Sequence, residues 1–130
     1  MLEVAYSSWC WTGAALFGAR LLHFLFDKHK EFEAWYLGDL DVIRAAYPEA
    51  KDNVLNGYIN DSIVGTWELL AEAIYKGGQK ALTKKGRQTV GEEKSKWAES
   101  ISPYMDIERN ASPSFIHMRE QLRQIMLLAN

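Results

Sequence analysis

The sequence feature that most constrains the fold is the segment from Val4 to Phe26, whose pattern is that of a helix apolar on nearly every side. At about 100° per residue, its polar side chains share a strip that covers roughly a quarter of the circumference. The strip consists of Thr12, Arg20, His23 and Asp27. Because so little of this helix is polar, other helices must cover it, and we expect it at the centre of the fold.

The rest of the sequence is helical in pattern, with no period-two run that would predict a strand. A chain of 130 residues, 48 % of them hydrophobic, is long enough for one domain with its own core. The sequence therefore predicts an all-α fold with a single domain over residues 1–130. We expect a compact bundle of five to six helices around the apolar N-terminal helix.

The apolar N-terminal segment does not have the pattern of a targeting or membrane-spanning sequence. No basic residue precedes it, and no obvious small-residue cleavage site follows it. A spanning helix would place Arg20 and His23 in hydrocarbon, which is costly. We therefore expect a cytoplasmic protein with no membrane partner.

A second helical region follows, and its apolar residues share one face. They are Phe32, Trp35, Tyr36, Val42, Ile43 and Ala46. Asp39 lies in the middle of this face, directly after Gly38. We favour a helix end at Gly38 and a second helix whose free N–H groups are capped by the Asp39 carboxylate. The alternative is a buried functional acid.

The next region can be interpreted in two ways. If one helix runs on from Pro48, it has a long apolar face: Ile59, Ile63, Trp67, Leu70, Ala71 and Ile74. Four polar residues then extend that face and form a candidate binding site for a polar ligand or for another chain's backbone: Asp52, Asn53, Asn56 and Asn60. The alternative is a short helix that ends at Asn56-Gly57, with these residues in a surface turn.

The segment from Lys76 to Gly91 has five basic residues, four glycines and no acid. We expect a mobile loop with at most a short helical turn at residues 81–84. Its cations form a second candidate binding site, for phosphate or an acidic surface: Lys76, Lys80, Lys84, Lys85 and Arg87. The spacing of a phosphate-binding loop is absent.

Two further helices are predicted towards the C-terminus. The first covers residues 91–101, with Trp97 and Ile101 facing inward, and Pro103 interrupts it. The second begins with Ser112 as N-cap and Pro113 in the first helical position. Its apolar stripe consists of Phe115, Met118, Leu122, Ile125, Met126 and Ala129.

Acid–base chemistry has one candidate group, made of Arg20, His23 and Asp27. Asp27 lies one turn after His23, so its carboxylate can orient the imidazole and favour the charged form. If another helix covers this strip, it is a buried polar site with general acid–base potential. If the strip faces water, it is the outer face of the helix.

Neither a metal nor a cofactor is expected. Cys10 is the only cysteine, which excludes a multi-cysteine zinc site. Glu68 and Glu72 are one turn apart, but both lie opposite the apolar face, and Glu72 is placed to pair with Lys76. Carboxylates that bind metal in a bundle must instead face inward.

The segment from Arg109 to His117 resembles a motif of the HEPN family of small helical ribonucleases. In that family an Arg, often followed by Asn, precedes a His near the start of a late helix. Arg109 and Asn110 match the Arg-Asn pair, although seven residues separate Arg109 from His117. The resemblance covers nine positions and implies that His117 acts as general acid–base while Arg109 holds a phosphate, usually across a dimer interface.

The charge is unevenly distributed along the chain. Residues 1–75 carry 5 basic and 11 acidic residues, and residues 76–130 carry 10 and 6, which gives −6 and +4. This pattern and the five tryptophans favour a non-enzymatic protein that binds another protein, as an inhibitor, an immunity-type factor or an assembly accessory factor. The acidic first part is the expected docking face for a basic partner. The alternatives are a HEPN-like ribonuclease or nucleotide-acting enzyme, and a binder of small apolar ligands.

Overall fold

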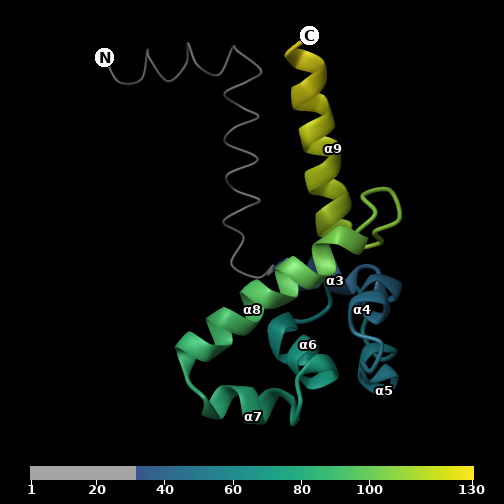
Figure 1. The fold of residues 1–130 in the computed structure, drawn as a ribbon. Coiled ribbons are helices and arrows are strands. Elements are labelled where there is room, and N and C mark those ends of the chain that lie inside the picture. Colours follow the sequence, from purple (N-terminus) through teal and green to yellow (C-terminus); the bar gives the residue numbers. More distant parts are fainter. Residues whose placement is uncertain (1–31) are drawn as a thin grey trace. The chain divides into compact units, whose positions relative to one another are not determined.

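A computed structural model describes residues 32–130 and shows seven α-helices, one 3-10 helix and no strand in that range (Figure 1). The predicted all-α fold is therefore confirmed. The apolar N-terminal helix lies outside the described residues, as do Cys10, Arg20, His23 and Asp27. No helix among residues 32–130 combines the length and the apolar character that crossing a bilayer requires.

The described residues divide between two units, 32–115 and 116–130. The first unit contains α3 (Phe32–Leu37), α4 (Leu40–Ala46), α5 (Asp52–Leu55), α6 (Thr66–Ile74), α7 (Gly78–Lys84), α8 (Arg87–Ile101) and η1 (Ser102–Tyr104). The last helix, α9 (Pro113–Leu128), begins at the end of the first unit and supplies the described part of the second. The single domain over residues 1–130 stays a prediction.

One hydrophobic core holds residues 32–115 together, with contributions from α3 to α8. Its buried members are Leu37, Val42, Ile43, Leu55, Leu70, Ala71, Ala73, Leu82, Trp97 and Ile101. Trp97 is 1 % exposed and Ile101 is fully buried, which confirms the predicted inward face of α8. Trp67 is half-buried and packs against this core.

The break between α3 and α4 occurs at the predicted position. Gly38 lies between the two helices and Asp39 is the N-cap of α4. The Asp39 carboxylate makes no capping hydrogen bond, however, because it accepts one from Arg109 instead. Phe32 was also expected on the buried face but is 64 % exposed, since α3 begins there.

Of the two interpretations of the region after Pro48, the continuous helix to Ile74 is excluded. α5 ends at Leu55, ten irregular residues follow at 56–65, and α6 begins at Thr66. Two residues in this stretch have left-handed backbone, Asp61 with φ 56° and Gly65 with φ 84°. Because a helix cannot contain such residues, the alternative of a short helix ending at Asn56-Gly57 describes this region.

The mobile loop predicted for residues 76–91 is also wrong, since α7 and the first part of α8 occupy it. Gly77 and Gly78 have φ of 90° and 76°, which allows the chain to turn sharply from α6 into α7. Leu82 is fully buried and anchors α7, which packs against α6 and α8 (Figure 1).

The start of α9 follows the predicted proline pattern, with Pro113 in the first helical position. The N–H of Ser114, one of the free donors of this helix end, is bound by the carboxylate of Asp61 at 2.7 Å. The cap therefore comes from a distant part of the chain.

Candidate functional site

The surface that stands out in residues 32–115 is the loop of residues 59–64, here called the Ile59–Val64 loop. Its aliphatic side chains are turned to solvent: Ile59 is 72 % exposed, Val64 71 % and Ile63 38 %. Single exposed aliphatic residues are ordinary on protein surfaces. Three β-branched ones within six residues form a concentrated apolar surface, on a loop that is held by hydrogen bonds.

Hydrogen bonds within the loop define its shape. The N–H of Asp61 donates to the Tyr58 hydroxyl at 3.1 Å, and both the N–H and the hydroxyl of Ser62 donate to the carbonyl oxygen of Ile59. Burial is the main cause that raises the pKa of Tyr58, so this phenol stays neutral. Asp61 itself has left-handed backbone, with φ 56°.

The Asp61 carboxylate anchors the loop to the segment before α9. It accepts hydrogen bonds from the Ser112 hydroxyl at 3.0 and 3.1 Å, from the Ser114 N–H at 2.7 Å and from the Ser114 hydroxyl at 3.1 Å. Ser112 and Ser114 are buried. The Ser114 hydroxyl in turn accepts from the Trp35 indole at 3.1 Å, so the loop is connected to α3.

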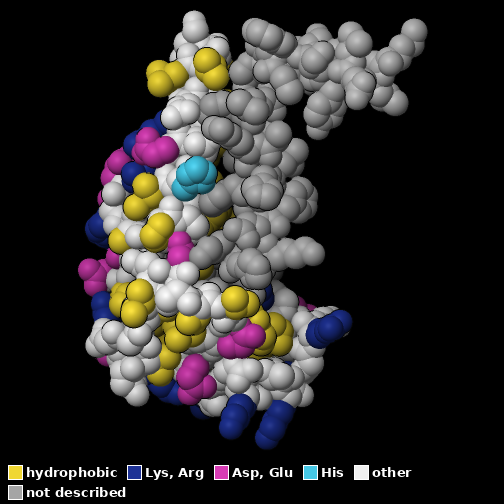
Figure 2. Space-filling view, turned by 180° about the vertical axis from the view of Figure 1, so that it is seen from behind, with side chains coloured by type: hydrophobic (Ala, Val, Ile, Leu, Met, Phe, Trp, Pro, Cys, Tyr) yellow, Lys and Arg dark blue, Asp and Glu magenta, His cyan; other side chains and the backbone are white. Residues whose placement is uncertain are grey.

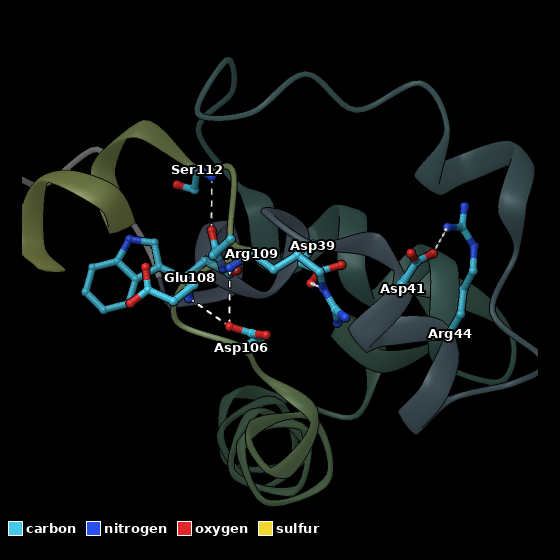
Figure 3. Close-up of polar contacts among 9 residues, drawn as sticks. Asp39, Asp41, Arg44, Asp106, Glu108, Arg109 and Ser112 are labelled. Atoms are coloured by element: carbon cyan, nitrogen blue, oxygen red, sulfur yellow. Dashed lines mark hydrogen bonds and ion pairs between the residues drawn. The ribbon is translucent and has the colours of Figure 1, made fainter.

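The anchoring segment is itself fixed to the α3–α4 junction. Asn110 is buried, donates to the carbonyl oxygen of Trp35 at 2.7 Å and accepts from the Ser112 N–H at 3.0 Å. The Ala111 N–H donates to the Gly38 carbonyl oxygen at 2.9 Å. Figure 3 shows the neighbouring Asp39–Arg109 ion pair.

These contacts give the Ile59–Val64 loop the properties of a binding surface. The Asp61 carboxylate and the Ser62 hydroxyl are hydrogen bonded within the protein, while Ile59, Ile63 and Val64 are exposed. Binding surfaces that are fixed beforehand lose less conformational entropy on association. The Ser112 and Ser114 hydroxyls beside the Asp61 carboxylate are buried, whereas Ile59, Ile63 and Val64 are turned to solvent.

Of the four predicted polar binding residues, the structure brings only two together. Arg44 donates to Asp52 and to Asn56, in each case at 2.8 Å, and so joins α4 to α5. Asn53 is exposed, and Asn60 instead donates to the carbonyl oxygen of Ala111 at 3.4 Å. The continuous stripe does not form because the helix that would align it is broken at residues 56–65.

The predicted Arg109–His117 pair is divided between the two units. Arg109 forms an ion pair with Asp39, and Asn110 is buried in the contacts described above (Figure 3). His117 is exposed on the part of α9 that belongs to the second unit. Arg109 and Asn110 thus both have structural partners in the first unit.

The predicted basic residues Lys80, Lys84, Lys85 and Arg87 are all exposed on α7 and at the start of α8. Glu72 pairs with Lys51 at 3.4 Å and not with Lys76. Among residues 32–130, no cluster of three or more histidine, cysteine or acidic residues is placed to hold a metal ion.

The tryptophans of the described region are packing residues. Trp97 is buried, Trp35 and Trp67 are half-buried, and Trp35 makes an edge contact with Phe115. Sequence reasoning missed the Ile59–Val64 loop as well as Asp61, Ser112 and Ser114 as its anchors. The run Asn60-Asp61-Ser62, three turn-forming residues, was the available signal.

No protein-family model, no curated protein and no solved structure matches this chain.

Proposed function

We propose that this protein acts by binding another protein through the Ile59–Val64 loop, as an inhibitor, an immunity-type factor or an assembly accessory factor. The observation that carries the proposal is the exposure of Ile59, Ile63 and Val64 on a loop whose Asp61 is held by four hydrogen bonds. We expect the protein to act in the cytoplasm.

The apolar loop is a stronger candidate contact than the acidic residues of the same unit. Asp41 and Asp52 both pair with Arg44, and Asp39 pairs with Arg109. Two arginines therefore compensate two of these three negative charges within the protein, and exposed ion pairs contribute at most about 1 kcal/mol each. Full burial of one aliphatic side chain contributes about 1.5–3 kcal/mol.

The shape of the loop indicates the shape of its partner. Exposed aliphatic side chains on a short loop are buried best by an apolar depression of the partner, such as the cleft of an enzyme or a groove between helices. A fixed loop that fills the cleft of an enzyme also inhibits that enzyme. This makes an inhibitor the preferred form of the proposal.

The test is a comparative pull-down from the native host's lysate. The bait proteins are the tagged wild type, the variant Ile59→Ser/Val64→Ser, and the control Met126→Ser/Leu127→Ser, which removes two exposed apolar side chains from α9. We expect one protein to be captured by the wild type and the control but not by the loop variant, while all three keep the same circular dichroism spectrum. Equal capture by the loop variant, or capture of nucleic acid alone, contradicts the proposal.

A further inference from the structure

A second surface of the first unit carries a concentration of positive charge. It consists of five exposed cations on α7 and its flanking turns, here called the cationic ridge: Lys76, Lys80, Lys84, Lys85 and Arg87. None of the five forms an ion pair with an acid among residues 32–130, whereas Arg44, Lys51, Lys94, Lys96 and Arg109 all do. Figure 2 shows basic side chains projecting at the lower end of the molecule, where α7 lies.

The ridge has a fixed backbone. Leu82 is buried beneath it, and the hydroxyl of Thr83 donates to the Gln79 carbonyl oxygen at 2.9 Å. The N–H of Gln79 donates to the carboxylate of Glu72 at 2.9 Å, so the beginning of α7 already holds an anion. An external anion would therefore meet the lysine side chains along the helix and at its end.

We propose that the cationic ridge binds an acidic segment of a partner polypeptide. Charge complementarity identifies the ligand as anionic, because five cations that form no ion pair among the described residues lie within twelve residues of chain, with only Lys80 near an acid, Glu72. The proposal concerns a surface other than the Ile59–Val64 loop and does not depend on the function proposed for it.

Three observations favour a polypeptide over a nucleic acid. The ridge is short, since α7 has seven residues, which is about 10 Å of helix. The chain carries a net charge of −2, which repels a long polyanion beyond the ridge. The ring of Tyr75, beside α7, already has Lys85 Nζ over one face at 5.4 Å from its centroid, which leaves little aromatic surface for a base to stack on.

The test measures binding of two labelled probes to the full-length protein by fluorescence anisotropy. The probes are an oligoglutamate peptide and an oligouridylate with the same number of charges. The ridge variant is Lys80→Gln/Lys84→Gln/Lys85→Gln, and the control Lys51→Gln/Lys96→Gln/Arg123→Gln removes three cations that are paired with Glu72, Glu93 and Glu120. Circular dichroism checks that both variants remain folded.

We expect the peptide to bind the wild type and the control alike and to bind the ridge variant about tenfold more weakly, as three exposed charge contacts imply. The affinity should fall as salt is added. Equal loss in both variants, or no peptide binding to the wild type, overturns the proposal. Tighter binding of the oligouridylate than of the peptide would identify the ridge as a nucleic-acid surface and overturn it as well.

Discussion

The carboxylate of Asp61 lies 2.7 Å from the backbone nitrogen of Ser114, although 53 positions separate the two residues in the chain. The first turn of α9 is thus capped by a loop that precedes α6. The same carboxylate accepts from the hydroxyls of Ser112 and Ser114, both in buried residues. One acidic residue therefore fixes both the Ile59–Val64 loop and the beginning of the last helix.

Replacement of Asp61 by Ala should lower the free energy of unfolding by about 1–3 kcal/mol, because it leaves buried donors without an acceptor. The variant Asp61→Asn retains one carbonyl oxygen and a residue that tolerates left-handed backbone, so its loss should be smaller. Urea denaturation followed by circular dichroism measures both. Equal stability of the Ala variant and the wild type would contradict the anchoring role.

Replacement of Gly38 by Ala tests the close packing at the α3–α4 junction. A Cβ atom at this position would lie 2.2 Å from the Asn110 Oδ1 atom and 2.9 Å from the Ser112 Cβ atom. Since these neighbours are themselves hydrogen bonded, we expect a loss of about 1–3 kcal/mol from overpacking. Thermal denaturation measures the effect.

The variant Gly91→Ala is the matched control for that substitution. Gly91 lies inside α8, and an added Cβ atom meets nothing within 4 Å. Alanine is the better helix former, so this change should stabilise the protein by about 0.5–1 kcal/mol. We expect Gly38→Ala to lower the free energy of unfolding and Gly91→Ala to raise it. If both substitutions raise it, the packing at Gly38 is looser than the structure indicates.

The elements that sequence predicts well are those fixed by short-range patterns. The helix break at Gly38 and Asp39, the inward face of α8 at Trp97 and Ile101, and the first position of α9 at Pro113 all follow from local residue chemistry. In each case the spacing of the apolar residues agrees with the residue that begins or ends the helix, so both indicate the same structure.

The exposure of the aliphatic residues in the Ile59–Val64 loop was not predicted, because their spacing is that of one face of a helix. Ile59, Ile63 and Trp67 are four residues apart, which is the pattern of one helical face, but only Trp67 packs against the core. The left-handed backbone of Asp61 prevents a helix here. This conformation is stabilised by hydrogen bonds from Ser112 and Ser114, which lie about 50 positions later in the sequence. The opposite error occurred at α7, where a segment with the composition of a loop forms a helix. Leu82 of this helix is buried by contact with α6 and α8, which the composition of the segment does not reveal.

The two tryptophans of the core region should differ in their contributions to stability. Trp97 is 1 % exposed, so Trp97→Ala should cost about 3–5 kcal/mol. Trp67 is half-buried, with Lys94 Nζ at 5.9 Å from the centre of its ring, and Trp67→Ala should cost less. Guanidinium denaturation followed by circular dichroism compares them. A larger loss for Trp67 would mean that this ring contributes more to the packing of the core than the ring of Trp97 does.

The charge of Glu72 should make part of the stability depend on pH. A hydrogen bond from the Gln79 N–H, and then the nearby Lys51, lower the pKa of Glu72 below its ordinary value. The folded protein therefore binds fewer protons at this site in acid than the unfolded chain does, so the contribution is present at neutral pH. It is lost as the pH falls below the ordinary glutamate pKa of about 4.3 and through the lower folded value.

The variant Glu72→Gln measures this contribution, since it keeps an oxygen acceptor for the Gln79 N–H but has no charge. Wild type should be more stable than Glu72→Gln at pH 7, and the difference should close as the pH is lowered, in urea denaturation at a series of pH values. Lys51→Gln should reduce this difference without removing it, because the hydrogen bond from Gln79 is the larger cause. A difference that stays constant with pH would show that the charge of Glu72 does not stabilise the turn between α6 and α7.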